Sequence, residues 1–356
     1  MDSVQLSAPV YETPAQKQKK KGISGSTIKI IAVVTMLIDH VAAALLTRML
    51  ISRGLLDISM SGDYVQIMQW IADNAVLYYG MSAMRMIGRL GFPIFCFLLV
   101  EGFQKTRNIK KYVFRMGLFA LISEIPFDLA CSGKVLEFGY QNVYFTLLIG
   151  ILTLCVFDFF AKHDMHKALQ VILTIVGILI LPGYAAVAFC NFVGSFVAQL
   201  GISLAYLMGG QEKITILLTV VYIVFVIAMV IAYAVFRRVK GSDRAWRMCA
   251  DMAALSVAMF AADFLRTDYS GMGVLTIAVM YLFRKRKVIS MLSGCVVLTL
   301  MSFNEITAFF ALIPIALYNG ERGLKMKYFF YIFYPAHLLI IWLIAAAMGM
   351  GWMSAI

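Results

Sequence analysis

The sequence predicts an all-α, polytopic transmembrane helix bundle of about eleven spans, within a range of nine to twelve. Of the 356 residues, 62% are hydrophobic and only 14% are charged, whereas a soluble domain is closer to half apolar and a quarter charged. Apolar stretches of about 18 residues or more recur along the chain, and each is long enough to cross a bilayer. Helices are expected because they satisfy their own backbone hydrogen bonds in lipid.

The expected spans follow one another at short intervals. The first is expected at 27–50, and a polar, amphipathic stretch at 51–84 separates it from the second, at 85–103. The region 168–208 is apolar but interrupted at Pro182–Gly183, so we expect one crossing with an added half-helix or re-entrant piece. The remaining spans are one that ends near Ala130 and others near 142–160, 214–236, 246–264, 272–283, 288–302, 305–318 and 328–349.

Segments rich in Lys and Arg alternate with segments that are poor in them. Cytoplasmic loops carry an excess of these residues, so the basic side is expected in the cytoplasm, with the N-terminus inside and the C-terminus outside. We expect 1–26 to be a disordered basic tail, 27–350 to form one transmembrane domain, and 351–356 to be a short tail. The basic segments are the N-terminal tail and the loops at 104–111, 161–167, 237–247, 284–287 and 319–327.

Several kinds of site are not indicated. The net charge of +12 resides mostly in short loops, where it sets topology and meets anionic lipid. A nucleic-acid partner is not expected, because no recognised nucleic-acid-binding motif is present. The six cysteines are isolated and form no CxxC, so neither a disulfide framework nor a metal site is expected. Walker, GxSxG and HExxH motifs are missing from the sequence as well.

Two histidines are expected near the middle of the membrane. His40 lies eleven residues after Lys29, roughly 16 Å along a helix, and Asp39 is next to it. Adjacent helical residues point about 100° apart, so we expect a residue of another helix to orient His40. In the last long span, His337 lies ten residues from Lys327. Ionisable groups at this depth are costly and tend to be functional, although a polar packing contact between helices is the alternative.

Charged pairs also occur within the second and third spans. Arg85 and Arg89 are four residues apart and share a helix face, as do Glu124 and Asp128. We expect these arginines to pair with these carboxylates across the two helices, which would lower the cost of burying them. The alternative is a purely structural staple. Pro126 removes an amide donor, so we expect the third helix to bend or end there, beside a cavity.

Further polar residues follow the ends of the spans on the expected outer side. Any one of them could be a helix cap, a role that suits Asn142 and Asn304. Together they indicate a polar cavity that opens outward, with the two histidines at its floor. The members of this group are Gln141, Asn142, Thr146, Asp263, Asp268, Tyr269, Asn304 and Glu305.

Several stretches resemble one known family. The most specific pieces are MLIDH in the first span and EIPFD in the third. Other matching pieces occur toward both ends of the chain, while the section 165–245 carries no such motif and looks inserted or diverged. They read RMIGRLGFPIFCFLLVEGF, TRNIKKYVFRMGLFALISEIPFD, QNVYFTLLIGIL, TDYSGMGVL, ALIPIALYNGERG and KYFFYIFYPAHLLII. On these residues the chain resembles the TraX family, and more broadly the integral membrane acyltransferases.

The resemblance implies a multi-pass protein of a bacterial inner or plasma membrane that transfers an acetyl group from cytoplasmic acetyl-CoA. The acceptor would be a hydroxyl or amine at the outer face, on a protein N-terminus, a glycan or a lipid head group. His40 matches the histidine that moves the acyl group. The catalytic candidates are His40, Asp39, Arg89, Glu124 and Asp128, and the acceptor or cavity candidates are Arg85, Gln141, Asn142, Asp268, Tyr269 and His337.

Basic residues of the inner loops could hold the CoA phosphates. Their alternative role is to set the topology alone. They are Lys105, Arg107, Lys110, Lys111, Arg322, Lys325 and Lys327.

Two rival functions remain open. A transporter or flippase would also place paired charges within the membrane, and the region 168–208 could supply a discontinuous helix. The absence of a convincing inverted repeat weighs against this class. The third reading is a non-catalytic membrane assembly factor. Binding or use of acetyl-CoA distinguishes the enzyme from both.

Overall fold

The computed structural model describes residues 21–199, 203–324 and 327–355, and within these ranges the chain is helical, with two isolated β-bridges and no strand. Seven of its helices are long and apolar enough to cross a membrane. The predicted polytopic helix bundle is therefore confirmed. Most of the predicted basic tail, residues 1–20, lies outside the described residues.

The first span is one continuous helical segment, Gly25–Ile51. It consists of α1 (Gly25–His40), a π-helical turn η1 (Val41–Leu46) and α2 (Thr47–Ile51). The hydroxyl of Ser24 accepts a hydrogen bond from the Thr27 amide at the start of α1, as N-cap serines do. π-turns inside helices occur frequently at functional sites, and this one begins directly after His40.

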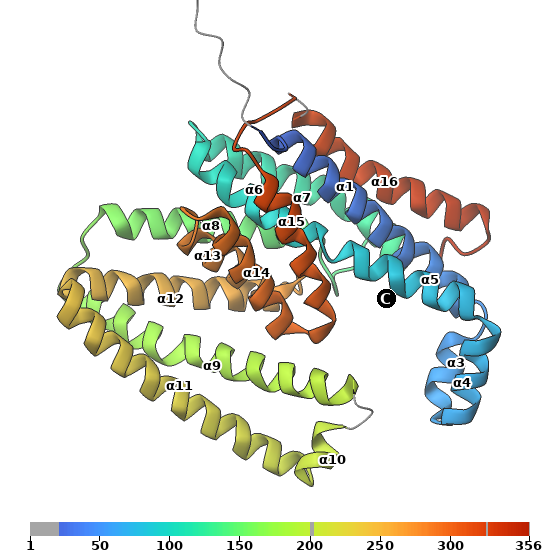
Figure 1. Ribbon diagram of the computed structural model, residues 1–356, viewed down its shortest axis with the longest axis horizontal. Helices are drawn as coiled ribbons and strands as arrows, with labels where there is room; N and C mark the ends of the chain where they lie inside the picture. Colours follow the sequence, from blue (N-terminus) through green and yellow to red (C-terminus); the bar gives the residue numbers. More distant parts are fainter. Residues whose placement is uncertain (1–20, 200–202, 325–326, 356) are drawn as a thin grey trace, which may run out of the picture.

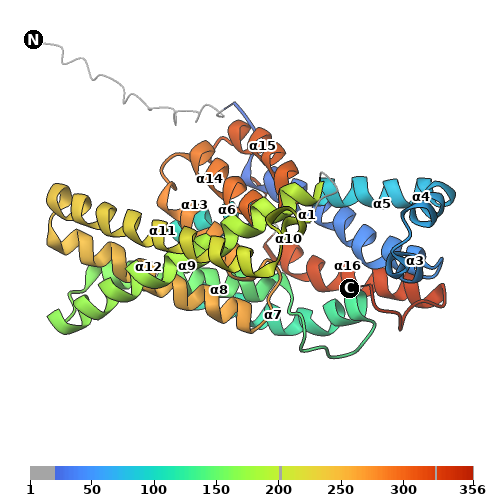
Figure 2. The same cartoon turned by 90° about the horizontal axis from the view of Figure 1, so that it is seen from below.

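The second span is longer than predicted. Helix α5 (Ala75–Gly88) runs almost without interruption into α6 (Gly91–Lys105), giving an apolar segment of 31 residues. The expected polar stretch at 51–84 is thus largely helical, because residues 75–84 are mainly apolar and extend the span. Before it, the short helices α3 (Leu55–Ser61) and α4 (Tyr64–Asp73) project from one end of the molecule (Figures 1 and 2).

Pro126 does not end the third helix. Helix α7 runs from Ile109 to Ser132, and it ends where Gly133 adopts a left-handed conformation, with φ of 67°. The carboxamides of Asn108 and Asn142 cap the N-termini of α7 and of α8 (Val143–Lys162), respectively. The predicted capping role of Asn142 is therefore confirmed.

The predicted interruption at Pro182–Gly183 is wrong. Helix α9 is continuous from Lys167 to Gln199, and the short α10 (Leu204–Met208) follows it. A proline inside a helix leaves backbone carbonyls of the preceding turn without their donors, and the hydroxyl of Tyr222 donates to one nearby carbonyl, that of Leu179. Two long helices, α11 (Gln211–Lys240) and α12 (Ser242–Phe264), pack against α9, forming one side of the molecule (Figure 1).

The C-terminal part contains shorter helices and one long one. They are α13 (Ser270–Leu282), α14 (Lys287–Met301), the 3₁₀ segment η2 (Phe303–Ala311), α15 (Leu312–Leu317) and α16 (Lys327–Ala347). Each of the eleven predicted spans coincides with a helical segment of the described chain. The segment expected at 305–318 is a 3₁₀ helix followed by a short α-helix.

Helix α6 lies in the core of the bundle. It packs against α1, α8, α13 and α14, and its side chains Ile94 and Cys96 are completely buried. One end of α6 follows Arg89, and the other end carries Glu101 and Lys105. The helix therefore connects the two regions of the molecule where charged residues gather.

Candidate functional site

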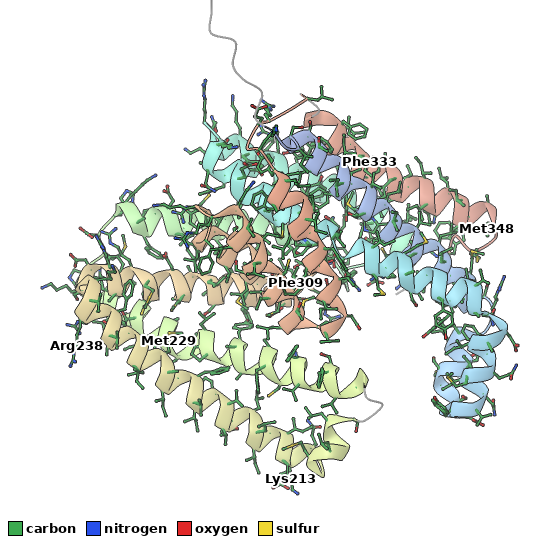
Figure 3. The ribbon with its side chains drawn as sticks, in the orientation of Figure 1. Lys213, Met229, Arg238, Phe309, Phe333 and Met348 are labelled. Atoms are coloured by element: carbon green, nitrogen blue, oxygen red, sulfur yellow. The ribbon has the colours of Figure 1, made fainter. Side chains whose placement is uncertain are left out.

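The two histidines predicted at mid-depth are in direct contact. His40 at the end of α1 and His337 on α16 approach to 2.7 Å between Nδ1 and Nε2, respectively. The ring of His337 lies between those of His40 and Phe333 (labelled in Figure 3), with centroid distances of 4.9 and 4.8 Å. A residue of another helix therefore orients His40, as expected. His337 is buried, while His40 is only half-buried.

The hydrogen bonds of this pair define its protonation when both rings are neutral. Nδ1 of His337 lies 2.7 Å from the carbonyl oxygen of Phe333, which can only accept, so Nδ1 of His337 carries the proton. Its Nε2 must then accept from Nδ1–H of His40. The remaining nitrogen, Nε2 of His40, is consequently unprotonated and can act as a base or nucleophile.

The charged residue next to His40 is held by an ion pair. Oδ2 of Asp39 lies 2.6 Å from the guanidinium of Arg85 on α5. The two helices meet at Gly88, where an added Cβ would lie only 2.2 Å from Oδ1 of Asp39. Glycine is therefore needed at 88 to admit the Asp39 carboxylate. The Arg85 guanidinium also interacts electrostatically with His40, and 31% of its side chain is exposed.

Arg89 has a different partner from the expected one. Its guanidinium lies 2.8 Å from Glu305 in η2, whose side chain is only 2% exposed. It also hydrogen bonds to the Tyr269 side chain, and the Tyr269 ring stacks on Phe92 with centroids 3.6 Å apart. The predicted pairing of Arg85 and Arg89 with Glu124 and Asp128 is thus wrong, because the arginines face α1 and η2.

Glu124 and Asp128 instead bind the loop that connects α7 to α8. Glu124 accepts hydrogen bonds from the backbone and side-chain amides of Asn142. Asp128 accepts from the backbone amide of Glu137 at 2.8 Å. Both carboxylates therefore fix the loop at the start of α8, which is the structural alternative to a catalytic role.

Gln141 in the α7–α8 loop and Asp268 in the α12–α13 loop connect these two loops to each other. The hydroxyl of Tyr140 donates to Asp268 at 2.7 Å. The backbone of Gln141 bonds to Arg266 and Asp268, forming an isolated parallel bridge with Thr267. This contact brings the Asp268–Tyr269 segment toward the Arg89 ion pair.

Four of the carboxylates described above do not have hydrogen bonds to both of their oxygens. Each has one buried oxygen without a hydrogen-bond partner among the described residues. Burying such an oxygen costs about 1–3 kcal/mol unless a ligand, proton or water completes it. The region is therefore polar and able to make further bonds. The oxygens are Oδ1 of Asp39, Oε1 of Glu124, Oδ1 of Asp128 and Oε2 of Glu305.

A basic cavity lies at the other end of α6. It has a volume of about 410 Å³ and is lined by residues of α6, the α13–α14 loop and the segment after α15. Lys287 donates to the carbonyls of Ala316 and Tyr318. Arg284 stacks on Tyr281 at 3.9 Å, whereas Lys285 bonds to no other described residue. The basic residues of its wall are Lys105, Arg284, Lys285 and Lys287.

Among the predicted cofactor residues whose side chains are described, only Lys105 lines this cavity. It also forms an ion pair with Glu101 at 2.7 Å. Lys325 lies outside the described residues, and for Lys327 only its place at the start of α16 is described. The predicted residues that do not line the cavity are Arg107, Lys110, Lys111 and Arg322.

The sequence alone does not identify several residues of the Arg89 ion pair and of the basic cavity. In the sequence, Glu305 is only one of many polar residues near span ends. Arg284, Lys285 and Lys287 belong to a basic loop that is expected to set the topology. The sequence contains a partial signal, because Glu305 lies six residues before the stretch ALIPIALYNGERG and the basic loop at 284–287 lies between that stretch and TDYSGMGVL.

Comparisons with known proteins agree with these motifs. A curated relative, the "Probable fimbrial assembly protein FimC, serogroup H1" of Dichelobacter nodosus, is 36% identical over 107 residues, which cover 28% of this chain and 42% of the relative. The match thus spans less than half of the relative's length. No solved structure matches. The family model described as TraX protein matches residues 24–258 and 196–345, so the chain belongs to the TraX family.

Proposed function

We propose that this protein is an integral membrane acyltransferase that uses acetyl-CoA. The acetyl group passes to a hydroxyl or amine of an acceptor at the opposite membrane face. The observation that carries the proposal is the contact between His40 of α1 and His337 of α16, with the free nitrogen of His40 unprotonated. A histidine that only packs between helices does not need hydrogen bonds that set the tautomer of its ring.

The pair supports general-base catalysis. Nε2 of His40 takes the proton of the acceptor as the acceptor attacks the thioester carbonyl. The tetrahedral intermediate collapses, the carbon–sulfur bond breaks, and the CoA thiolate leaves with the proton from His40. While His40 is charged, its Nδ1–H donates to His337, whose own Nδ1–H is held by the Phe333 carbonyl. His337 is thus a positioning residue.

Arg85 is the better candidate for stabilising the oxyanion. Arg89 is engaged by buried Glu305 and by Tyr269. Arg85 has one carboxylate partner, Asp39, and a partly exposed side chain beside His40. A positioned guanidinium stabilises negative charge that develops in a transition state. We therefore assign this role to Arg85 and a structural role to the Arg89–Glu305 pair.

The basic cavity is a suitable site for the CoA phosphates. It offers several cationic side chains, and phosphates bind to such donors by charge-assisted hydrogen bonds. Its wall includes Phe97, five residues along α6 from Phe92, which stacks on Tyr269. Five residues of helix correspond to about 7.5 Å. The donor would therefore reach along α6 from the basic end of the bundle toward Tyr269, which contacts Arg89.

Location and acceptor follow from the same proposal. The basic loops would lie in the cytoplasm of a bacterial cell, where acetyl-CoA is made, and the Asp268–Tyr269 end would face outward. The name of the Dichelobacter nodosus relative, a probable fimbrial assembly protein, favours an acceptor that becomes part of a surface fibre.

The experiment uses the purified protein in liposomes with acetyl-CoA labelled in its acetyl group. We expect transfer of label to peptides with a free N-terminus or to hydroxyl acceptors, and stabilisation of the protein by CoA. At a hundredfold excess over Kd, a ligand stabilises the native state by about 2.7 kcal/mol.

Two outcomes would contradict the proposal. Ion-coupled uptake of a solute without acetyl transfer would identify a transporter. If the folded protein shows neither acetyl transfer nor stabilisation by CoA, it is a non-catalytic assembly factor.

A further inference from the structure

A second cavity lies away from the histidine pair, between α9 and α11. Its volume is about 710 Å³, and its floor is formed by the end of α12, the start of α13 and Met301 of α14. The wall is mainly apolar. A few polar side chains interrupt it, notably Tyr184, Asn191 and Asp263.

The cavity lies within the apolar part of the bundle. Asn191 precedes the end of α9 by eight residues and Thr219 follows the start of α11 by eight, each about 12 Å of helix. The nearby α11 side chains Ile216 and Ile223 are 55% and 50% exposed. Since α11 is apolar enough to cross a membrane, these exposed side chains would face lipid, and the cavity lies beside them.

The polar groups of the wall have a definite chemistry. Among the described residues that line the cavity, Asp263 is the only Asp, Glu, Lys, Arg or His. It accepts hydrogen bonds from the Gly271 amide and the Tyr184 side chain, but remains exposed to the cavity. The exposed amide of Asn191 has no partner among the described residues. One carboxylate with no nearby cation suits a positively charged group with N–H donors.

We propose that this cavity binds a membrane lipid whose head group carries a primary amine. The alkyl chain lies against α9 and α11, where each buried CH₂ contributes about 0.8 kcal/mol. The ammonium group lies near Asp263 and Asn191. Because Ser270 lines the cavity directly after Tyr269, the bound lipid also packs beside the loop that contacts Arg89. This proposal is independent of acetyl transfer.

The test compares lipids with identical acyl chains and different head groups. Native mass spectrometry of the detergent-solubilised protein measures retention of phosphatidylethanolamine, phosphatidylcholine and phosphatidylglycerol. We expect wild type to retain phosphatidylethanolamine at least about tenfold more strongly than the other two, since a tenfold ratio needs only 1.4 kcal/mol. Asp263→Asn should remove this head-group preference.

A filled cavity provides the second arm. Gly183 lines the cavity, and a Cβ there would lie 3.8 Å from the Tyr222 ring. Gly183→Ala is therefore the matched control and should bind as wild type does, whereas Gly183→Trp should lose the lipid. Thr219→Phe fills the same space from α11 and replaces Gly183→Trp if that variant does not fold.

Three results would overturn the proposal. They are equal retention of all three lipids by wild type, a preference for the anionic lipid, and unchanged retention in a folded variant with the cavity filled. If a hydrophobic peptide occupies the cavity, all three lipids are retained equally, which is the first of these results. The cavity would then be a binding site for a protein partner.

Discussion

Two arginines near the first span show opposite solutions to burial within the bundle. Arg48 in α2 is completely buried, and its guanidinium donates to four backbone carbonyls, those of Ala44, Leu129, Ala130 and Met353. Arg85 in α5 has one carboxylate partner, Asp39, and keeps 31% of its side chain exposed. The guanidinium of Arg48 thus donates its hydrogen bonds to backbone carbonyls, while the guanidinium of Arg85 can still bind a second anionic group.

The difference distinguishes a structural group from one available for chemistry. Arg48 connects the π-turn, the end of α7 and the C-terminal segment, where the Ala355 amide also donates to the Cys131 carbonyl. A ligand could bind Arg48 only by breaking these contacts. At the histidine pair, by contrast, His40 is half-buried and Asp39 keeps an unpaired oxygen. A buried oxygen without a hydrogen-bond partner is costly, so the unpaired oxygen of Asp39 needs an explanation, and a ligand or proton at the site would supply one.

The largest expected effect concerns His40. Replacing it by Asn keeps the size and some hydrogen bonding, but removes the base. We expect acetyl transfer to fall by about 10²–10⁴-fold, the usual contribution of a general base, while the thermal unfolding midpoint changes little. Transfer of label from acetyl-CoA and thermal unfolding in detergent measure the two quantities.

His166→Asn is the matched control, because His166 is an exposed loop residue between α8 and α9. It should have normal activity. Near-normal transfer by His40→Asn would assign His40 to the structural class, and His337 would become the next candidate for the base.

The second prediction concerns stability rather than activity. Arg48→Ala leaves four carbonyls without their shared donor, and we expect it to destabilise the protein by about 3 kcal/mol. The kcat of the folded fraction should stay close to that of wild type. Arg53→Ala is the control, because Arg53 is exposed and its guanidinium donates to the side chain of Asn74.

We expect the Arg53 variant to change stability by no more than about 0.5 kcal/mol. A folded Arg48→Ala protein with normal stability and no activity would reverse the comparison, because Arg48 would then belong to the functional group.

The sequence predicted the helices and both histidines, but not the ion pairs. Apolar length gives the spans, and counting from Lys29 and Lys327 places His40 and His337 at similar depth. The partner of a charged side chain depends on how the helices are arranged around one another. The spacing of residues along the chain does not contain this information. Spacing alone therefore pairs Arg89 with a carboxylate of the third span, although its partner Glu305 lies far along the chain.

The third prediction tests that ion pair. In a double-mutant cycle, Arg89→Ala and Glu305→Ala should couple by about 2 kcal/mol, because the side chains touch. Arg89→Ala and Glu124→Ala should be additive within about 0.5 kcal/mol. Thermal or denaturant unfolding in detergent provides the free energies. Coupling of Arg89 to Glu124 in place of Glu305 would restore the pairing expected from the sequence.

The same contrast occurs in the basic cavity, and it gives the smallest expected effect. Lys287 donates to two backbone carbonyls, whereas Lys285 bonds to no other side chain or backbone group of the described residues. We therefore expect Lys285→Ala to raise KM for acetyl-CoA about tenfold, equal to 1.4 kcal/mol, without changing kcat. Lys110→Ala, an exposed lysine outside the cavity, should leave KM unchanged. Equal effects of the two substitutions would mean that general surface charge, rather than this cavity, attracts CoA.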